Sequence, residues 1–131
     1  MSYTAFRHLV SAAMALLLVG VGLMSFAGCA VFAPQQTVAS LCAQITEQNA
    51  GVICVKAGYS AVRDAAIVVQ RRYEEKRISL SAARSILESL EKANTAVSFA
   101  ELAVLAGEFG TAQGQMDTAI NVLTAIEGRL Q

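Results

Sequence analysis

The sequence contains one proline and no tryptophan, and its nine glycines are few for a chain of 131 residues. An all-β domain needs many tight turns and a linker-rich chain needs many flexible residues, so this composition argues against both. Ten basic side chains balance ten acidic ones. This balance excludes a strongly basic nucleic-acid-binding domain and a disordered tail with a large net charge. The sequence therefore favours an all-α protein with one domain.

Histidine is nearly absent, since His8 is the only one and lies close to the N-terminus. Serine and cysteine nucleophiles usually depend on a histidine base, and many zinc sites use histidine ligands. The aspartates, Asp64 and Asp117, do not stand among other carboxylates at a spacing typical of a metal site or a glycosidase. We therefore expect a protein that is not an enzyme and that binds neither a cofactor nor a metal.

A long apolar segment occupies residues 9–33, where the Cys29 thiol is the only ionisable side chain. Arg7 and His8 precede it, so the layout is that of a secretory signal peptide, with a basic start, an apolar stretch and small residues. The segment is also long enough to span a bilayer as an uncleaved transmembrane helix, for which about 20 apolar residues suffice. An ordinary cleaved signal without lipidation is a third interpretation. All three export the rest of the chain.

The end of this segment, Phe26-Ala27-Gly28-Cys29, resembles the lipobox of bacterial lipoproteins, although that family usually has leucine where Phe26 stands. The resemblance implies that the Cys29 sulfur is diacylated and that the signal is cleaved in front of it. In this family an aspartate directly after the lipidated cysteine retains the protein in the inner membrane, and Ala30 stands here instead. The resemblance thus implies a lipid anchor in the cell envelope, at the outer membrane facing the periplasm of a Gram-negative host.

Cleavage at this site divides the chain into a signal peptide at 1–28, a lipidated tether at 29–36 and a helical domain at 37–131. Within the domain, apolar residues recur in alternating steps of three and four, which places them on one face of a helix. The pattern predicts a short helix at about 37–47 and long helices at about 52–76, 80–106 and 111–130.

Capping and turn residues bound these segments. Thr37 and Ser79 are expected as N-caps, residues 49–51 as the break between the first two helices, and residues 107–110 as the last turn. The residues expected in the core are Val38, Leu41 and Ile45 in the first segment, Val55, Tyr59, Val62, Ala66, Val69 and Tyr73 in the second, Ala83, Ile86, Leu90, Ala93, Val97, Ala100 and Val104 in the third, and Ala112, Met116, Ala119, Leu123, Ile126 and Leu130 in the fourth.

Long helices joined by short turns pack antiparallel along most of their length. The expected fold is therefore an up-and-down three-helix bundle with a short extra N-terminal helix, preceded by the N-terminal signal or anchor helix. Many of the expected core residues are alanines, which bury little surface each. We expect such a bundle to gain stability from dimerisation, so a homo-oligomer is one expected partner state.

Cys42 and Cys54 lie on either side of the expected break between the first two helices. An exported chain reaches an oxidising compartment, in which an even pair of cysteines is generally bridged. The sequence therefore predicts a Cys42–Cys54 disulfide that joins these helices, with two buried free thiols as the alternative.

A charged block follows at residues 71–77, where the second long pattern ends. Basic side chains near a helix C-terminus interact favourably with the helix dipole, so a solvated helix end is the expected role. Contact with anionic lipid headgroups or an acidic partner is the alternative, which the mixed signs of the block disfavour.

The chain is also similar to the short, alanine-rich helical lipoproteins that bacterial and prophage genomes encode, and the specific motif of this resemblance is the Cys29 site. The resemblance implies a location and no activity. We therefore expect a membrane-tethered, non-enzymatic binding or scaffolding module with a protein partner and without nucleic acid. Two alternatives stay open: exclusion of a superinfecting phage or an entering plasmid, and an accessory factor that positions or inhibits a periplasmic cell-wall enzyme.

Overall fold

The structure is a computed structural model that describes residues 35–131, with side chains from Val38 onward. No strand occurs in this part of the chain, so the prediction of an all-helical fold is confirmed. The predicted signal peptide at 1–28, the Cys29 site and most of the tether at 29–36 lie outside the described residues. The described helices are α2 (Gln35–Leu41), α3 (Gln48–Glu74), α4 (Leu80–Leu105) and α5 (Phe109–Leu130).

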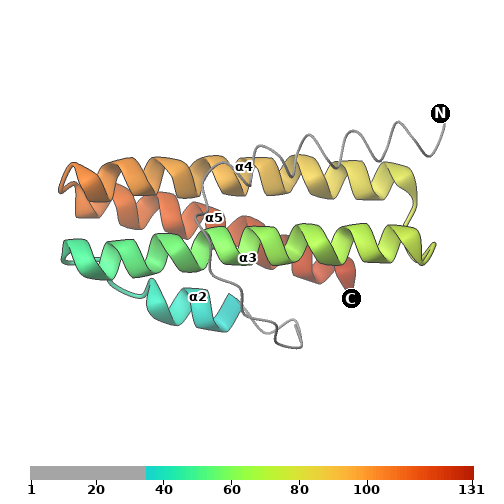
Figure 1. Cartoon of the computed structure of the whole chain (residues 1–131), viewed down its shortest axis with the longest axis horizontal. Coiled ribbons are helices and arrows are strands. Elements are labelled where there is room, and N and C mark those ends of the chain that lie inside the picture. Colours follow the sequence, from blue (N-terminus) through green and yellow to red (C-terminus); the bar gives the residue numbers. More distant parts are fainter. Residues whose placement is uncertain (1–34) are drawn as a thin grey trace.

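The three long helices lie side by side and run in alternating directions (Figure 1). Their connections are short, with residues 75–79 between α3 and α4 and residues 106–108 between α4 and α5. Helix α2 is shorter and packs against α3 and α5. The described residues therefore form an antiparallel helical bundle.

The core of this bundle is hydrophobic, and no polar or charged side chain is buried in the part of the chain that the structure describes. Every core residue expected in 80–106 and in 111–130 is buried, so these two predictions are confirmed. In α3 only the tyrosines depart from the expectation, because Tyr59 and Tyr73 lie half-buried at the edge of the core. The bundle depends on a few large, fully buried side chains set among many alanines, including Ile86, Met116 and Ile126.

Tyr59 connects α3 to α4 at this edge, since its hydroxyl donates a 2.7 Å hydrogen bond to Glu101 Oε2. Partial burial raises the pKa of the Tyr59 hydroxyl above its usual value of 10.0, and the hydrogen bond to Glu101 raises it further. The phenol therefore stays protonated at neutral pH and keeps its bond. A tyrosine suits this position because its ring packs on apolar neighbours while its hydroxyl reaches a polar partner.

The helix ends follow the capping residues of the sequence. Ser79, the expected N-cap of α4, accepts a 3.1 Å hydrogen bond from the backbone N–H of Ala82. The C-terminal ends of α3 and α4 share a Schellman motif with a left-handed residue, Lys76 with φ 57° and Gly107 with φ 76°. In both motifs the next residue donates a 2.8 Å backbone hydrogen bond to the carbonyl five positions earlier.

Replacing Lys76 by glycine is expected to stabilise the bundle by about 0.5 to 1 kcal/mol, because a side chain in the left-handed region is strained and glycine is not. The same exchange at Lys92, which is exposed in the middle of α4, should instead cost about 1 kcal/mol, as glycine does in a helix interior. Chemical denaturation of both variants measures the two effects. A Lys76→Gly variant less stable than the parent chain would contradict this description of the helix end.

The break between the first two helices lies at residues 42–47, so the expectation of a break at 49–51 was wrong. Gly51 lies buried inside α3. A Cβ atom at Gly51 would lie 2.6 and 2.8 Å from the methyl groups of Val104 on α4. The glycine therefore permits close approach of two helices and does not end one, and Gly58, two turns further along, faces similarly tight surroundings.

The short helix also differs from its expected bounds. Helix α2 begins at Gln35, so Thr37 lies inside it and is not its N-cap. It ends at Leu41, which is 42% exposed although it was expected in the core. Ile45 is buried as expected, but from the irregular segment after the helix. A helix of seven residues is too short to be stable by itself, so packing against α3 and α5 decides its bounds.

Candidate functional site

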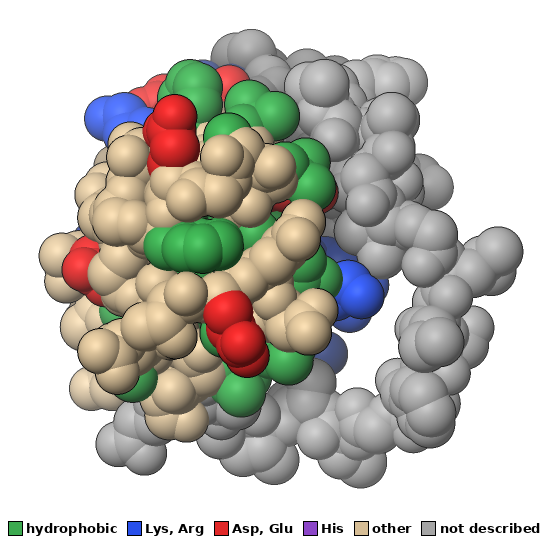
Figure 2. All heavy atoms as spheres, turned by 90° about the vertical axis from the view of Figure 1, so that its left-hand side faces the viewer, with side chains coloured by type: hydrophobic (Ala, Val, Ile, Leu, Met, Phe, Trp, Pro, Cys, Tyr) green, Lys and Arg blue, Asp and Glu red, His purple; other side chains and the backbone are tan. Residues whose placement is uncertain are grey.

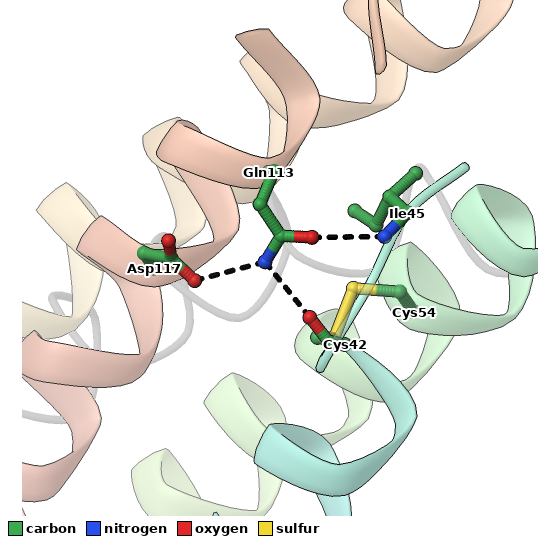
Figure 3. Close-up of a disulfide and its surroundings, with 5 residues drawn as sticks. All are labelled: Cys42, Ile45, Cys54, Gln113 and Asp117. Carbon is green, nitrogen blue, oxygen red and sulfur yellow. Dashed lines mark hydrogen bonds between the residues drawn. A yellow bond between two sulfur atoms is a disulfide. The ribbon is translucent and has the colours of Figure 1, made fainter. Parts of the chain in front are cut away.

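A disulfide joins the segment after α2 to the second turn of α3 (Figure 3). The sulfur atoms of Cys42 and Cys54 are 2.06 Å apart, and their Cα atoms are 5.0 Å apart. Both side chains are buried, with 1% and 0% of their surface exposed. The predicted pairing is therefore present in the structure, and it ties α2 to the bundle across the irregular segment at 42–47.

Gln113 on α5 holds the same segment by its amide group (Figure 3). Its Oε1 accepts a 2.9 Å hydrogen bond from the backbone N–H of Ile45, and its Nε2 donates a 2.8 Å bond to the carbonyl of Cys42. Nε2 also donates a 3.0 Å bond to Asp117 Oδ1, one turn along α5. The irregular backbone has no helical partners for these groups, so Gln113 supplies them. Sequence reasoning missed Gln113, because nothing near it in the sequence points to a partner 68 or 71 positions away.

A shallow groove lies beside this junction, between the irregular segment and the first half of α5. Asp117 is the only titrating side chain that lines it, because Cys42 is in the disulfide. One exposed carboxylate forms neither an acid-base pair nor a set of metal ligands. The groove therefore holds neither of these arrangements.

Large hydrophobic side chains gather on the surface near the same end of the bundle. Figure 2 looks at this end and shows hydrophobic side chains together in its upper part, over α4. The three most exposed large hydrophobic side chains of the described residues all belong to α4: Phe99, Leu102 and Leu105, at 55%, 59% and 64%. We call these three residues the α4 ridge. A cluster of exposed apolar side chains of this size is typical of an interaction surface.

The charged block at 71–77 lies at the opposite end, where α3 finishes (Figure 1). Arg71 and Arg72 occupy the last turn of α3, where the helix dipole favours positive charge. In the loop, Arg77 Nε lies 3.1 Å from Glu75 Oε2. Opposite charges thus pair within the block, which supports the expected role as a solvated helix end.

No group of three or more histidine, cysteine, aspartate or glutamate side chains comes together among residues 35–131 in a way that could hold a metal ion. Helices α2 to α5 include none that is long and apolar enough to cross a membrane. The described residues thus define a disulfide-linked helical bundle with an apolar ridge near one end. No known protein family, curated protein or solved structure matches this chain. Three features of the chain bear on its function: the Cys29 motif, the disulfide and the α4 ridge.

Proposed function

We propose that the chain is an exported lipoprotein in which acyl chains on Cys29 anchor a helical bundle to the cell envelope. The observation that carries the proposal is the sequence Phe26 to Cys29 at the end of an uncharged apolar segment. Because Ala30 follows the cysteine, the proposed location is the outer membrane, facing the periplasm. The Cys42–Cys54 disulfide supports export, since disulfides persist in oxidising compartments.

The proposed anchor would hold the bundle close to the membrane surface. Six positions separate Cys29 from Gln35, the first residue of α2, and a fully extended chain of this length reaches about 20 Å. Helix α3, with 27 residues, is about 40 Å long. The tether is thus shorter than the bundle, so the bundle would work as a module fixed at the surface and not as a domain on a long flexible stalk.

The role we propose for this module is binding or scaffolding, without catalysis. No charged side chain of the described residues is buried in the core. Asp117 is the only charged side chain that lines the groove beside the disulfide. Three of the six large hydrophobic side chains that are exposed among the described residues form the α4 ridge, and exposed apolar side chains that lie together are a feature of contact surfaces. A binding role therefore fits the surface of the described residues better than an enzymatic one.

The test is the Cys29→Ser variant of the full chain in a bacterial host fed radioactive palmitate. We expect the label to disappear and a full-length precursor to accumulate, because the serine hydroxyl cannot replace the acylated sulfur. The matched control is the Cys42→Ser/Cys54→Ser variant, which changes two cysteines and should keep its label. Two acyl chains anchor a protein stably where one is marginal, so the parent chain should need detergent for extraction.

Unchanged palmitate labelling of the Cys29→Ser variant would refute the lipoprotein proposal. A parent chain that takes up no label, stays in the membrane and has the same size as the Cys29→Ser variant would instead establish an uncleaved transmembrane helix. Release of an unlabelled, shortened parent chain into the periplasm would establish an ordinary cleaved signal.

A further inference from the structure

The α4 ridge is exposed although it is as apolar as the core. Phe99 and Leu102 are one turn apart on the outer side of α4, and more than half of each side chain is exposed. Leu105 continues the ridge toward the turn that leads into α5. Leaving these side chains in water costs the free energy that burial would otherwise provide, about 25 cal/mol for each Å².

A row of small, uncharged residues runs along the outer side of α5. Its glycines have no steric role within the chain, because a Cβ atom at Gly110, Gly114 or Gly128 would meet nothing within 4 Å. Glycine in a helix interior costs about 1 kcal/mol relative to alanine, so Gly114, which lies inside α5, has no intramolecular explanation. The row lies opposite the buried face of α5 and consists of Gly110, Gly114, Thr118, Asn121, Ala125 and Gly128.

Phe99 and Leu102 of the ridge lie on the same face of the bundle as the row. The Ser85 hydroxyl accepts a 3.1 Å hydrogen bond from Arg129 Nη2, which marks the exposed seam between α4 and α5. Phe99 follows Ser85 by four helical turns, and Thr118 precedes Arg129 by three, so both lie along the same seam. We call this surface the α4–α5 face.

The heights of the two features along the bundle also match. The helices are antiparallel, and Ser85 is level with Arg129. We count the same number of residues from Ser85 along α4 and from Arg129 back along α5. This count places Leu102 level with position 112, between Gly110 and Gly114. It places Phe99 level with position 115, between Gly114 and Thr118. Leu102 and Phe99 thus stand at the heights of shallow positions on α5.

We propose that the α4–α5 face binds the same face of a second copy of this chain. A two-fold axis parallel to the helices would set Leu102 of each copy between Gly110 and Gly114 of the other, and Phe99 between Gly114 and Thr118. Such an interface is isologous, because each contact occurs twice. Leu102 and Phe99 of each copy fill the part of the α5 row between Gly110 and Thr118 of the other copy, and α4 of one copy packs antiparallel to α5 of the other.

Charge and area favour a second copy over a lipid surface. The α5 row carries no charge, and the charged residues of α4 are of mixed sign: Arg84, Glu88, Glu91, Lys92 and Glu101. A face that binds anionic lipid is instead rich in lysine and arginine. Two helices about 10 Å wide each, over the length of α5, offer roughly 650 Å² per copy. That area approaches the about 800 Å² per partner of a standard specific interface.

The experiment places the photocrosslinker p-benzoylphenylalanine at Phe99 in the full chain, in intact cells that express two copies with different tags. We expect a crosslinked product that carries both tags, with the crosslink mapping to residues 110–118 of the other copy. Gly114→Leu fills the receiving position and should reduce this product at least tenfold. Ser60→Leu is the matched control, because Ser60 is exposed on α3, which is not part of the α4–α5 face. It should leave the product unchanged.

A Cβ atom at Gly114 would meet nothing within 4 Å, Ser60 is exposed, and leucine has a higher helix propensity than glycine or serine, so both variants should melt at or above the temperature of the parent chain. Loss of the product therefore reports the interface and not unfolding. A crosslink to lipid, to another protein or to residues 1–34, no crosslink, or a product insensitive to Gly114→Leu would each overturn the proposal. The outcome does not depend on the state of Cys29, so this test is separate from that of the anchor.

Discussion

Leu90→Ala is expected to lower the free energy of unfolding of residues 35–131 by about 2 to 5 kcal/mol. Leu90 is 3% exposed, near the middle of the buried face of α4. The core around it contains many alanines, which cannot move to fill the space that the leucine leaves. This loss is a large part of the about 5 to 15 kcal/mol that stabilises a small domain.

Lys92→Ala is the matched control for this variant, because Lys92 lies two residues further along α4 and is exposed. Its replacement should change the free energy of unfolding by no more than about 0.5 kcal/mol. Urea denaturation followed by circular dichroism measures both variants. Equal effects would mean that the register of α4 is wrong. A broad, non-cooperative transition of the parent chain would mean that the bundle needs a second copy or a membrane to fold.

Removing the disulfide is the second large change. The Cys42→Ala/Cys54→Ala variant is expected to lose about 3 kcal/mol, the amount that the chain-entropy model assigns to closing a loop of this size. Cys42 and Cys54 are 12 positions apart and both buried, so the bridge restrains α2 and the irregular segment together. A reducing agent should destabilise the parent chain by a similar amount and leave the variant unchanged.

The bridge itself is tested by mass spectrometry of peptides prepared without reduction, which should contain Cys42 linked to Cys54. Alkylation of both thiols in the folded protein before any reductant is added would show that they are free. In that case the Gln113 hydrogen bonds alone would hold the segment after α2 against the bundle.

The sequence predicted the buried faces of α4 and α5 best, and for α4 a second, independent signal agreed with the helical spacing. The core residues of both helices recur at helical spacing, and Ser79 caps α4 as expected. The bounds of α5 were less accurate, since Phe109 and Gly110 were assigned to the turn and belong to the helix. Periodicity identifies the buried face of a helix, whereas backbone geometry fixes the ends.

The region before α3 was harder to predict because tertiary contacts override local signals there. Gly51 is typical of a helix end, yet its place inside α3 follows from contact with Val104, far away in the sequence. Gln113 was overlooked for the same reason, since its partners Cys42 and Ile45 lie on another element. The cysteine pair could be predicted because its chemistry depends on the compartment as well as on geometry.

Intact mass spectrometry of the protein extracted from membranes with detergent tests the central claim most directly. The account predicts a chain of residues 29–131 that carries acyl groups on Cys29, with two hydrogens fewer than the reduced form because of the Cys42–Cys54 bridge. A mass equal to the full, unacylated chain of 131 residues would contradict it.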